Sequence, residues 1–294
     1  MFRGPARQKP HEQVLKLDDG RLLGYTEYGD PGGAPVLYFH GWPGSRLEAA
    51  PWDAAAKASH VRLIAIDRPG YGLSDFRPHR TIGDWPADVA ESADLLGLER
   101  FAVVGYSGGG PYALVCGWRL AGRVTRLAII SSPSELTDPT MLRGMSASNR
   151  RLMGLARRFP RALTLPFGGM AFVVRRLPGL ATKGLSRIDR DLLKGTPGLE
   201  AALLRSSREA FRHGVRGAAE DGALLARPWG LRLEDVDVEV LLWQGEADTQ
   251  VPPAMGHHLA THLPRCSPTF IPTASHLWGP ANGDTVLRAL ARDA

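Results

Sequence analysis

Short apolar runs recur along the chain, and segments of helical character separate them. Runs that are apolar at every position are typical of parallel strands whose two faces are both covered by helices. The pattern therefore predicts an α/β fold built on a parallel sheet. The predicted strands span residues 36–39, 61–66, 101–104, 124–130 and 238–243, with a weaker candidate at 269–271, and helices are predicted at 48–58 and 112–120.

Two segments near the start of the chain indicate a β-hairpin. Residues 14–17 and 21–28 flank the turn Asp18-Asp19-Gly20. Two strand-like segments joined by a short turn that contains glycine are typical of antiparallel pairing. A second turn, Asp30-Pro31-Gly32-Gly33, separates this hairpin from the first apolar run.

One long region interrupts the strands. Between Ser131 and Arg232 no apolar run matches the others in strength, and helices are predicted at 141–158, 184–194 and 199–212. A stretch of about 100 residues without a strand is too long for an ordinary loop and is more typical of an inserted helical domain. We expect two units, which are an α/β core formed by residues 1–132 and 233–294 and a helical cap formed by residues 133–232.

The segment Gly105-Tyr106-Ser107-Gly108-Gly109 lies between a predicted strand and a predicted helix. The pattern G-x-S-x-G in that position is typical of the nucleophile elbow of serine hydrolases. The two outer glycines suit a tight turn that brings the strand and helix backbones close together. The alternative is a glycine-rich turn whose serine only caps the helix, so the prediction depends on finding partners for Ser107.

A nucleophilic serine needs a base and a carboxylate that orients the base. His276 follows the last predicted strand in a loop, and Asp248 follows the strand at 238–243. The chain order Ser, acid, His is the order typical of this kind of elbow. Two other carboxylates, Glu246 and Asp237, compete for the role, but we expect Glu246 on the surface and Asp237 at the far end of its strand. We expect His257, His258 and His262 on a helix, away from the nucleophile.

The tetrahedral intermediate of such a reaction needs backbone N–H donors. The turn His40-Gly41-Trp42-Pro43-Gly44 directly follows the strand at 36–39. We predict the main-chain N–H groups of Trp42 and Gly108 as the two oxyanion donors, and we expect His40 to bond backbone within the turn. The block at 67–75 begins Asp67-Arg68. We predict that it is a buried, salt-bridged scaffold and that its side chains do not take part in the reaction.

The composition of the chain mainly excludes some classes of protein. Hydrophobic residues make up 44% of the chain and charged residues 22%, which is typical of a globular protein. The two cysteines, Cys116 and Cys266, have neither metal-ligand nor disulfide spacing, and Cys116 is expected to pack in the core. No secretory signal and no membrane-spanning run is visible, so we expect a cytoplasmic protein. We also expect no cofactor and no metal. A homo-oligomer is left open.

The net charge of +6 is unevenly distributed. Residues 134–230 hold 17 Lys and Arg against 8 Asp and Glu. Such a surplus attracts anionic substrates or surfaces. No aromatic interleaving or nucleic-acid motif accompanies it, so we interpret it as the solvated faces of short helices and expect no nucleic-acid partner.

Taken together, the chain resembles the α/β-hydrolase family, in its cap-bearing serine hydrolase branch, which includes esterases and proline iminopeptidases. The resemblance implies an eight-stranded, mostly parallel sheet with helices on both faces and a helical cap after the sixth strand. It also implies a triad of Ser107, Asp248 and His276. The motifs that carry it span most of the chain and are residues 40–44, 67–74, 105–109 and 245–248 together with His276.

Departures from the family's patterns narrow the expected activity. Epoxide hydrolases and haloalkane dehalogenases carry aspartate where this chain has Ser107. Proline iminopeptidases usually have glycine at the position of Trp42 and a GGSWGG elbow, so peptidase activity is less favoured. We therefore expect hydrolysis of a small-molecule carboxylic ester. The same triad also serves aminopeptidases, amidases, C–C hydrolases and perhydrolases, and a ligand receptor on a hydrolase scaffold is an alternative of another class.

Overall fold

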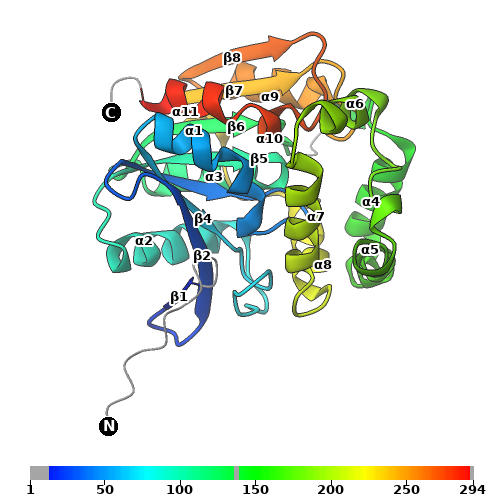
Figure 1. Cartoon of the computed structure of the whole chain (residues 1–294), viewed down its shortest axis with the longest axis horizontal. Helices are drawn as coiled ribbons and strands as arrows, with labels where there is room; N and C mark the ends of the chain where they lie inside the picture. Colours follow the sequence, from blue (N-terminus) through cyan, green and yellow to red (C-terminus); the bar gives the residue numbers. More distant parts are fainter. Residues whose placement is uncertain (1–12, 136–138, 292–294) are drawn as a thin grey trace.

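The computed structural model describes residues 13–135 and 139–291. Its centre is an eight-stranded sheet in the order β1-β2-β4-β3-β5-β6-β7-β8 (Figure 1). β1 pairs antiparallel with β2 and β2 with β4, whereas all other neighbours are parallel, which confirms the predicted hairpin and sheet. The strands are β1 (Gln13–Lys16), β2 (Leu22–Gly29), β3 (Ala34–Phe39), β4 (Val61–Ile66), β5 (Phe101–Tyr106), β6 (Val124–Ile130), β7 (Val240–Gly245) and β8 (Cys266–Ile271).

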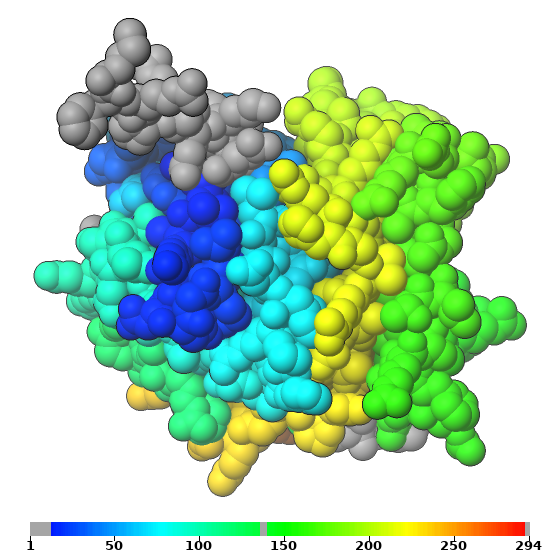
Figure 2. All heavy atoms as spheres, turned by 90° about the horizontal axis from the view of Figure 1, so that it is seen from below, coloured from blue at the N-terminus to red at the C-terminus, as the bar shows by residue number. Residues whose placement is uncertain are grey.

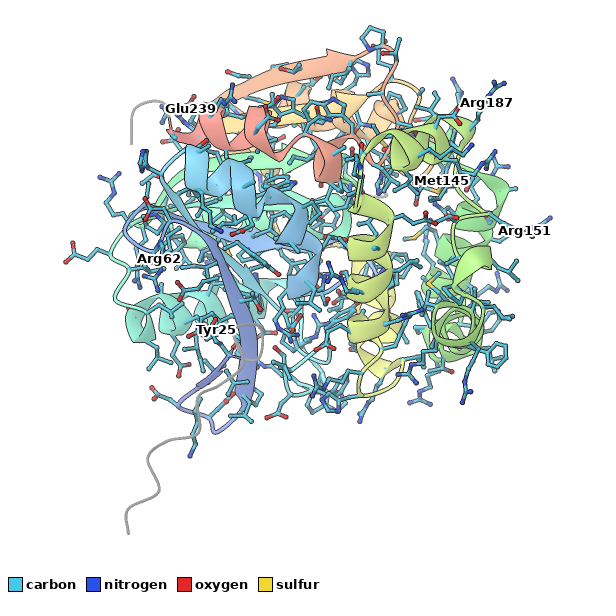
Figure 3. All side chains as sticks on the ribbon, viewed as in Figure 1. Tyr25, Arg62, Met145, Arg151, Arg187 and Glu239 are labelled. Carbon is cyan, nitrogen blue, oxygen red and sulfur yellow. The ribbon has the colours of Figure 1, made fainter. Side chains whose placement is uncertain are left out.

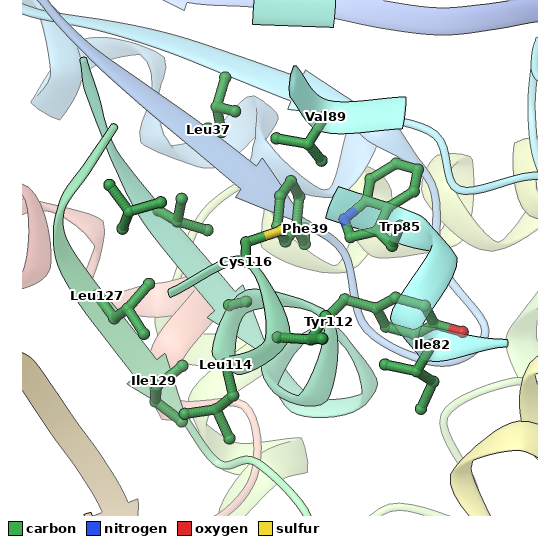
Figure 4. Close-up of a cluster of buried hydrophobic side chains, with 14 of the residues drawn as sticks. Leu37, Phe39, Ile82, Trp85, Val89, Tyr112, Leu114, Cys116, Leu127 and Ile129 are labelled. Carbon is green, nitrogen blue, oxygen red and sulfur yellow. The ribbon is translucent and has the colours of Figure 1, made fainter. Parts of the chain in front are cut away.

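Successive residues of the central strands point to opposite faces of the sheet and enter two separate cores. In β3, Leu37 and Phe39 belong to the core on one face, whereas Val36 and Tyr38 belong to the core on the other. Figure 4 shows the first core, where Phe39 lies near Trp85. Both faces are apolar, so both require a covering layer of helices.

Outside residues 133–232, three α-helices pack on the first core and two on the second, and Leu224 and Leu225, within that range, also belong to the first core. The first set is α2 (Trp85–Leu95), α3 (Gly110–Arg119) and α9 (Pro253–His262), and the second is α1 (Asp53–Ala58) and α11 (Gly283–Ala291), with the short α10 (Trp278–Ala281) preceding α11. Cys116 on α3 is buried, as expected, and Cys266 is half-buried, both as free thiols. No helix within the described ranges is long and apolar enough to cross a membrane.

The helix predicted at 48–58 is divided in the structure. A 3-10 helix spans Arg46–Trp52 and α1 follows it. Pro51 lies near the junction, and a proline has no backbone N–H to donate into a regular helix. Sequence analysis missed α2 altogether, and it placed the start of β8 at residue 269, three residues later than observed.

A helical insertion connects β6 to β7 and contains five α-helices within its described residues. Figure 2 shows it, coloured green to yellow, as a layer along one side of the molecule. The three predicted helices are present within a few residues of their predicted ends, except that the first begins at Ala147. The helices are α4 (Ala147–Arg158), α5 (Thr164–Arg176), α6 (Arg187–Gly195), α7 (Leu199–Ala210) and α8 (Arg216–Leu225).

Two helices of the insertion, α5 and α8, were not predicted. Pro166 weakens the helical pattern of α5, but it lies in the first turn of that helix, where proline is tolerated. Gly217 and Gly222 weakened the helical pattern of α8. A Cβ at Gly217 would lie 2.3 Å from the Gly70 carbonyl oxygen, so α8 needs a glycine there to pack against the core.

A buried network of charges joins the insertion to the core. Asp221 on α8 accepts from Arg68 Nε at 2.8 Å and from the Tyr112 hydroxyl at 2.7 Å, and it also pairs with Arg80. All four side chains are at most 4% exposed. Burial tends to raise the pKa of Asp221, but the charges of Arg68 and Arg80 outweigh it and hold the pKa well below its ordinary value. The carboxylate is therefore the counter-charge of two buried guanidinium groups.

We predict that Asp221→Asn lowers the free energy of unfolding by about 3 to 5 kcal/mol, because it leaves two buried cations without their anion. Urea denaturation of the purified variant measures this. Asp235→Asn, at an exposed position, is the control and should change the value by less than about 0.5 kcal/mol. Equal stability of Asp221→Asn and the wild type would show that the network does not hold the insertion.

Candidate active site

Ser107 lies at the sharp turn between β5 and α3. Its backbone φ is +49°, in the left-handed region that strains any residue with a Cβ. The turn continues as a 3-10 helix over Ser107–Gly109 and leads directly into α3. This places the serine at the carboxyl end of a central strand and at the start of a helix, where the helix dipole favours negative charge.

Close packing around the elbow explains its glycines. A Cβ at Gly109 would lie 2.1 Å from the Phe39 carbonyl oxygen, and one at Gly105 would lie 2.7 Å from the Ala113 Cβ. Neither approach is possible for a larger residue without moving β3, β5 or α3. The glycines therefore allow the contacts that hold Ser107 in its strained conformation.

The structure brings the three predicted triad residues together. The His276 Nε2 lies 3.0 Å from the Ser107 Oγ, and the His276 Nδ1 lies 2.8 Å from the Asp248 Oδ2. The other carboxylate oxygen of Asp248 accepts from the backbone N–H groups of Gln250 at 2.8 Å and Val251 at 3.0 Å. The carboxylate is thus fixed in place and orients the imidazole, so that one ring nitrogen faces the serine hydroxyl.

Burial and charge act on His276 in opposite directions. The side chain is 6% exposed, and burial alone lowers the pKa of an imidazole. The negative charge and hydrogen bond of Asp248 outweigh that effect and raise the pKa of His276 above its ordinary value. The imidazole is therefore a stronger base than a solvated histidine, as the transfer of a serine proton requires.

The loop that carries His276 is held by residues that sequence analysis did not identify. Asp189 on α6 of the insertion is fully buried, and its carboxylate accepts from the Leu277 backbone N–H and the Ser275 hydroxyl, both at 2.9 Å. The Tyr106 hydroxyl donates to the His276 carbonyl oxygen at 3.3 Å. No motif marks Asp189, because its partners lie 86 and 88 residues further along the chain.

The predicted oxyanion donors are neighbours. A Cβ at Gly108 would lie 3.3 Å from the Trp42 backbone nitrogen and 2.6 Å from the Trp42 Cβ. Among the residues that the structure describes, neither N–H group donates a hydrogen bond to the protein. The indole of Trp42 is anchored to the insertion, where its Nε1 donates to the Ala218 carbonyl oxygen at 2.8 Å. The two N–H groups are therefore available to a bound group.

Arg68 and His40 fix the turn that carries Trp42. The Arg68 guanidinium donates to the His40 carbonyl oxygen, and to the Gly41 carbonyl oxygen at 3.0 Å. Burial and the Arg68 charge hold the pKa of His40 well below its ordinary value, so the ring is neutral. Its Nδ1 lies 2.8 Å from the Gly41 carbonyl oxygen, and its Nε2 accepts from the Arg68 backbone N–H. The predictions that His40 bonds backbone and that the Asp67-Arg68 block is a buried scaffold are confirmed.

Two cavities share Ser107 and His276 in their walls. The first has a volume of about 180 Å³ and contains no charged lysine, arginine or carboxylate. The second has a volume of about 380 Å³ and is mainly aliphatic, but Glu48 and Glu200 line it. The apolar side chains of the first cavity come from both the core and the insertion and include Met145, Leu152, Met153, Phe167, Met170, Leu225 and Met255.

Glu48 is a polar group of the second cavity that sequence analysis missed. One carboxylate oxygen accepts from the Gly41 backbone N–H at 2.6 Å and from the Tyr38 hydroxyl at 3.2 Å. Burial raises the pKa of this carboxyl to about 7, although those hydrogen bonds and the Arg68 charge oppose the rise. The side chain therefore changes charge near neutral pH at the edge of the site.

The competing residues lie elsewhere. Glu246 and Asp237 are exposed, and neither contacts the imidazole of His276. The three histidines of the segment 257–262 lie on α9, as predicted, and none of them bonds the serine. Within residues 13–135 and 139–291, no cluster of three histidine, cysteine or carboxylate side chains could hold a metal ion.

Several proteins of known function match part of this chain in sequence. The chain is 36% identical over 125 residues to a non-heme chloroperoxidase of Streptomyces lividans and 31% identical over 139 residues to a proline iminopeptidase of Neisseria meningitidis. The matches span 40% and 44% of this chain, and in each case 44% of the relative, so the chain spans less than half of either relative's length.

A solved esterase from Rhodococcus has the same fold. It superimposes with a TM-score of 0.67 at 20% identity, and the match covers 96% of this chain and 99% of that one. Residues 34–278 match the family described by the alpha/beta hydrolase fold. The eight-stranded, mostly parallel sheet with its helical insertion after β6 is the architecture of that family. The chain therefore belongs to the alpha/beta hydrolase family.

Proposed function

We propose that this protein hydrolyses small carboxylic esters through an acyl-enzyme formed on Ser107. The observation that supports the proposal most directly is the line of hydrogen bonds from Ser107 through His276 to Asp248. A helix-capping serine would need no such base, and here the base has its own buried carboxylate. The line ends at two cavities that are large enough for the two substituents of an ester carbonyl.

In the acylation step, the Ser107 oxygen attacks the ester carbonyl carbon while its proton passes to the His276 Nε2. The carbonyl oxygen becomes an oxyanion that the backbone N–H groups of Trp42 and Gly108 stabilise. Collapse of this intermediate breaks the bond to the alcohol, which takes the proton from His276 and leaves. Asp248 stabilises the imidazolium while it carries that proton.

Deacylation repeats the sequence with water as the nucleophile. His276 removes a proton from water, the hydroxyl attacks the acyl carbon, and the proton returns to the Ser107 oxygen as the acid leaves. Burial of the site makes its fixed charges and dipoles more effective than they are in water. The products are a carboxylic acid and an alcohol, and no metal or cofactor takes part in any step.

The cavities favour uncharged, hydrocarbon-like substituents. Methionine, leucine and phenylalanine side chains form most of the smaller cavity. Burial of each methylene group of a ligand against such a surface contributes roughly 0.8 kcal/mol. We therefore expect short to medium acyl or alkyl groups there. The structural likeness to an esterase supports this choice of substrate class by analogy.

A second candidate function is an aminopeptidase, and one observation favours it. Glu48 and Glu200 both line the larger cavity, which has no lysine or arginine in its walls. Two carboxylates would bind the free amino group of a peptide substrate. Against this candidate, Glu200 is exposed and the insertion as a whole is basic. Parallel assays on p-nitrophenyl esters and on proline p-nitroanilide distinguish the two functions.

We predict that Ser107→Ala lowers kcat for p-nitrophenyl butyrate by on the order of 10⁶-fold, because the nucleophile is lost. Initial rates at saturating ester measure this. Ser267→Ala, on the exposed side of β8, is the control and should hydrolyse the ester like the wild type. Undiminished turnover by Ser107→Ala would refute the proposed mechanism, and a single stoichiometric turnover by the wild type would favour a receptor.

We predict two effects of Asp248→Asn. The value of kcat falls by on the order of 10⁴-fold, because the imidazole loses its orienting carboxylate. The acidic limb of the kcat/KM profile moves to lower pH, because the Asp248 charge raises the pKa of His276 and its removal lets that pKa fall. Rates measured from pH 5 to 9 test both effects.

The matched control for Asp248→Asn is Glu246→Gln, which removes an exposed carboxylate from the same loop. It should leave both the rate and the position of the acidic limb unchanged. If Glu246→Gln reproduces the effects of Asp248→Asn, or if the limb of Asp248→Asn moves to higher pH, the assignment of Asp248 is wrong.

A further inference from the structure

One continuous segment of the insertion carries a basic surplus without any counter-charge. Residues 139–188 contain ten lysines and arginines and no aspartate or glutamate, whereas the rest of the chain holds 26 basic residues against 30 acidic ones. Ten positive charges in 50 residues therefore account for more than the whole net charge of +6. The sequence led us to expect solvated helix faces here. In the structure, exposed apolar side chains accompany these charges.

The arginines of this segment differ from those of the core. Arg46, Arg68 and Arg80 are buried and each pairs with a carboxylate. By contrast, six exposed arginines of α4, α5 and the turn between them form no ion pair with any described residue. These are Arg150, Arg151, Arg157, Arg158, Arg161 and Arg176. Figure 3 shows Arg151 directed outward at the edge of the molecule.

The same segment also exposes most of the large apolar side chains that lie on the described surface. Of nine such residues, seven lie between positions 159 and 188. Leu165 is 78% exposed, Phe172 is 59% exposed and Phe159 is 58% exposed. Leu177 and Leu180, which follow α5, are 44% and 43% exposed. A monomeric protein rarely gathers so many exposed apolar side chains in one place without a partner for them.

Two of these side chains, Leu165 and Phe172, lie on the outer face of helix α5. Leu165 and Phe172 are seven residues apart, so they lie on the same side of the helix. The opposite side, which includes Phe167 and Val174, is buried in a core shared with α7 and α8. In Figure 1, α4 and α5 lie at the edge of the molecule that is farthest from α2. The outer face of α5 is therefore fully open to a flat partner.

We propose that this surface, the α4–α5 face, binds an anionic lipid surface. We define the face by the six unpaired arginines together with Phe159, Leu165, Phe172 and Leu177. Arginine side chains reach lipid phosphates and carboxylates, while leucine and phenylalanine side chains enter the hydrocarbon below them. Neither the arginines nor the apolar side chains of the face are needed for the fold, because all of them are exposed.

Other partners fit the α4–α5 face less well. Two copies of the chain would bring two sets of unpaired arginines together, and like charges oppose such a contact. A nucleic acid offers phosphates but no hydrocarbon for Leu165 and Phe172. A lipid surface supplies both chemistries and adapts to the convex outline of a single helix.

The location of α5 connects the face to the cavities. Met170, on the same helix, lines both cavities, and Phe167 lines the smaller one and packs against Trp42. One helix therefore separates the proposed lipid surface from the proposed ester site. Faster hydrolysis of esters dissolved in vesicles would follow, and that consequence rests on the proposed function. Lipid binding itself does not depend on the proposed function, because the α4–α5 face and the triad share no residue.

The test is co-sedimentation of the full chain with phosphatidylcholine vesicles, with and without 30% phosphatidylglycerol. Each arginine near an anionic lipid surface strengthens binding by roughly fivefold. We expect the wild type to bind the anionic vesicles at least tenfold more tightly than the neutral ones, and we expect salt to weaken this binding. Triple neutralisation in Arg158→Gln/Arg161→Gln/Arg176→Gln should lower binding by on the order of 10²-fold.

A second variant tests the apolar half of the face. Leu165→Ser/Phe172→Ser should lower binding to the anionic vesicles by at least tenfold. The matched control is Leu95→Ser/Arg100→Gln, which removes an exposed leucine and an exposed arginine at and just beyond the end of α2. It should bind like the wild type. Circular dichroism and thermal unfolding verify that all three variants are folded, which their exposure predicts.

Several results would overturn the proposal. These are failure of the wild type to bind anionic vesicles, equal binding to neutral vesicles, and unchanged binding by both face variants. A concentration-dependent dimer that Leu165→Ser/Phe172→Ser abolishes would assign the face to a second copy of the chain. Binding of the wild type to RNA in preference to vesicles would assign it to nucleic acid. Loss of ester hydrolysis in Ser107→Ala, with lipid binding intact, would leave both proposals standing.

Discussion

Ser107 keeps a φ of +49° because its glycine neighbours allow β3, β5 and α3 to approach more closely than any Cβ would permit. That packing aims the serine at the carboxyl edge of the sheet, where the loops after β7 and β8 deliver Asp248 and His276. The other site groups are placed relative to this edge. Without the strained turn, the Ser107 hydroxyl would not face the His276 Nε2, and the imidazole would keep Asp248 as a partner but have no hydroxyl to deprotonate.

The helical insertion helps to build the site as well as cover it. Asp221 on α8 neutralises Arg68, which in turn holds the carbonyl groups of the turn before Trp42. Asp189 on α6 bonds the residues on either side of His276. Two buried carboxylates of the insertion thus stabilise two loops of the core. A disturbance of the insertion is therefore expected to reach the turn that carries Trp42 and the imidazole of His276 together.

The sequence predicted the parts of the site that depend on topology. Ser107, Asp248 and His276 each follow a strand, and parallel strands place their carboxyl ends at one edge, so strand order alone brings them together. It did not predict Asp189, Asp221 or Glu48, because their partners are distant in sequence and no local pattern marks them. It also missed α5, where Pro166 and two glycines hide a helix, and with it the exposed apolar face that changes the interpretation of the basic surplus.

The proposed function requires that Ser107 is a nucleophile activated by His276. Labelling of the native protein with a fluorophosphonate probe, followed by mass spectrometry of its peptides, tests that claim without a choice of substrate. We predict a single modified residue, Ser107, and no labelling after heat denaturation. Labelling of any other residue, or no labelling of the folded protein, would contradict it.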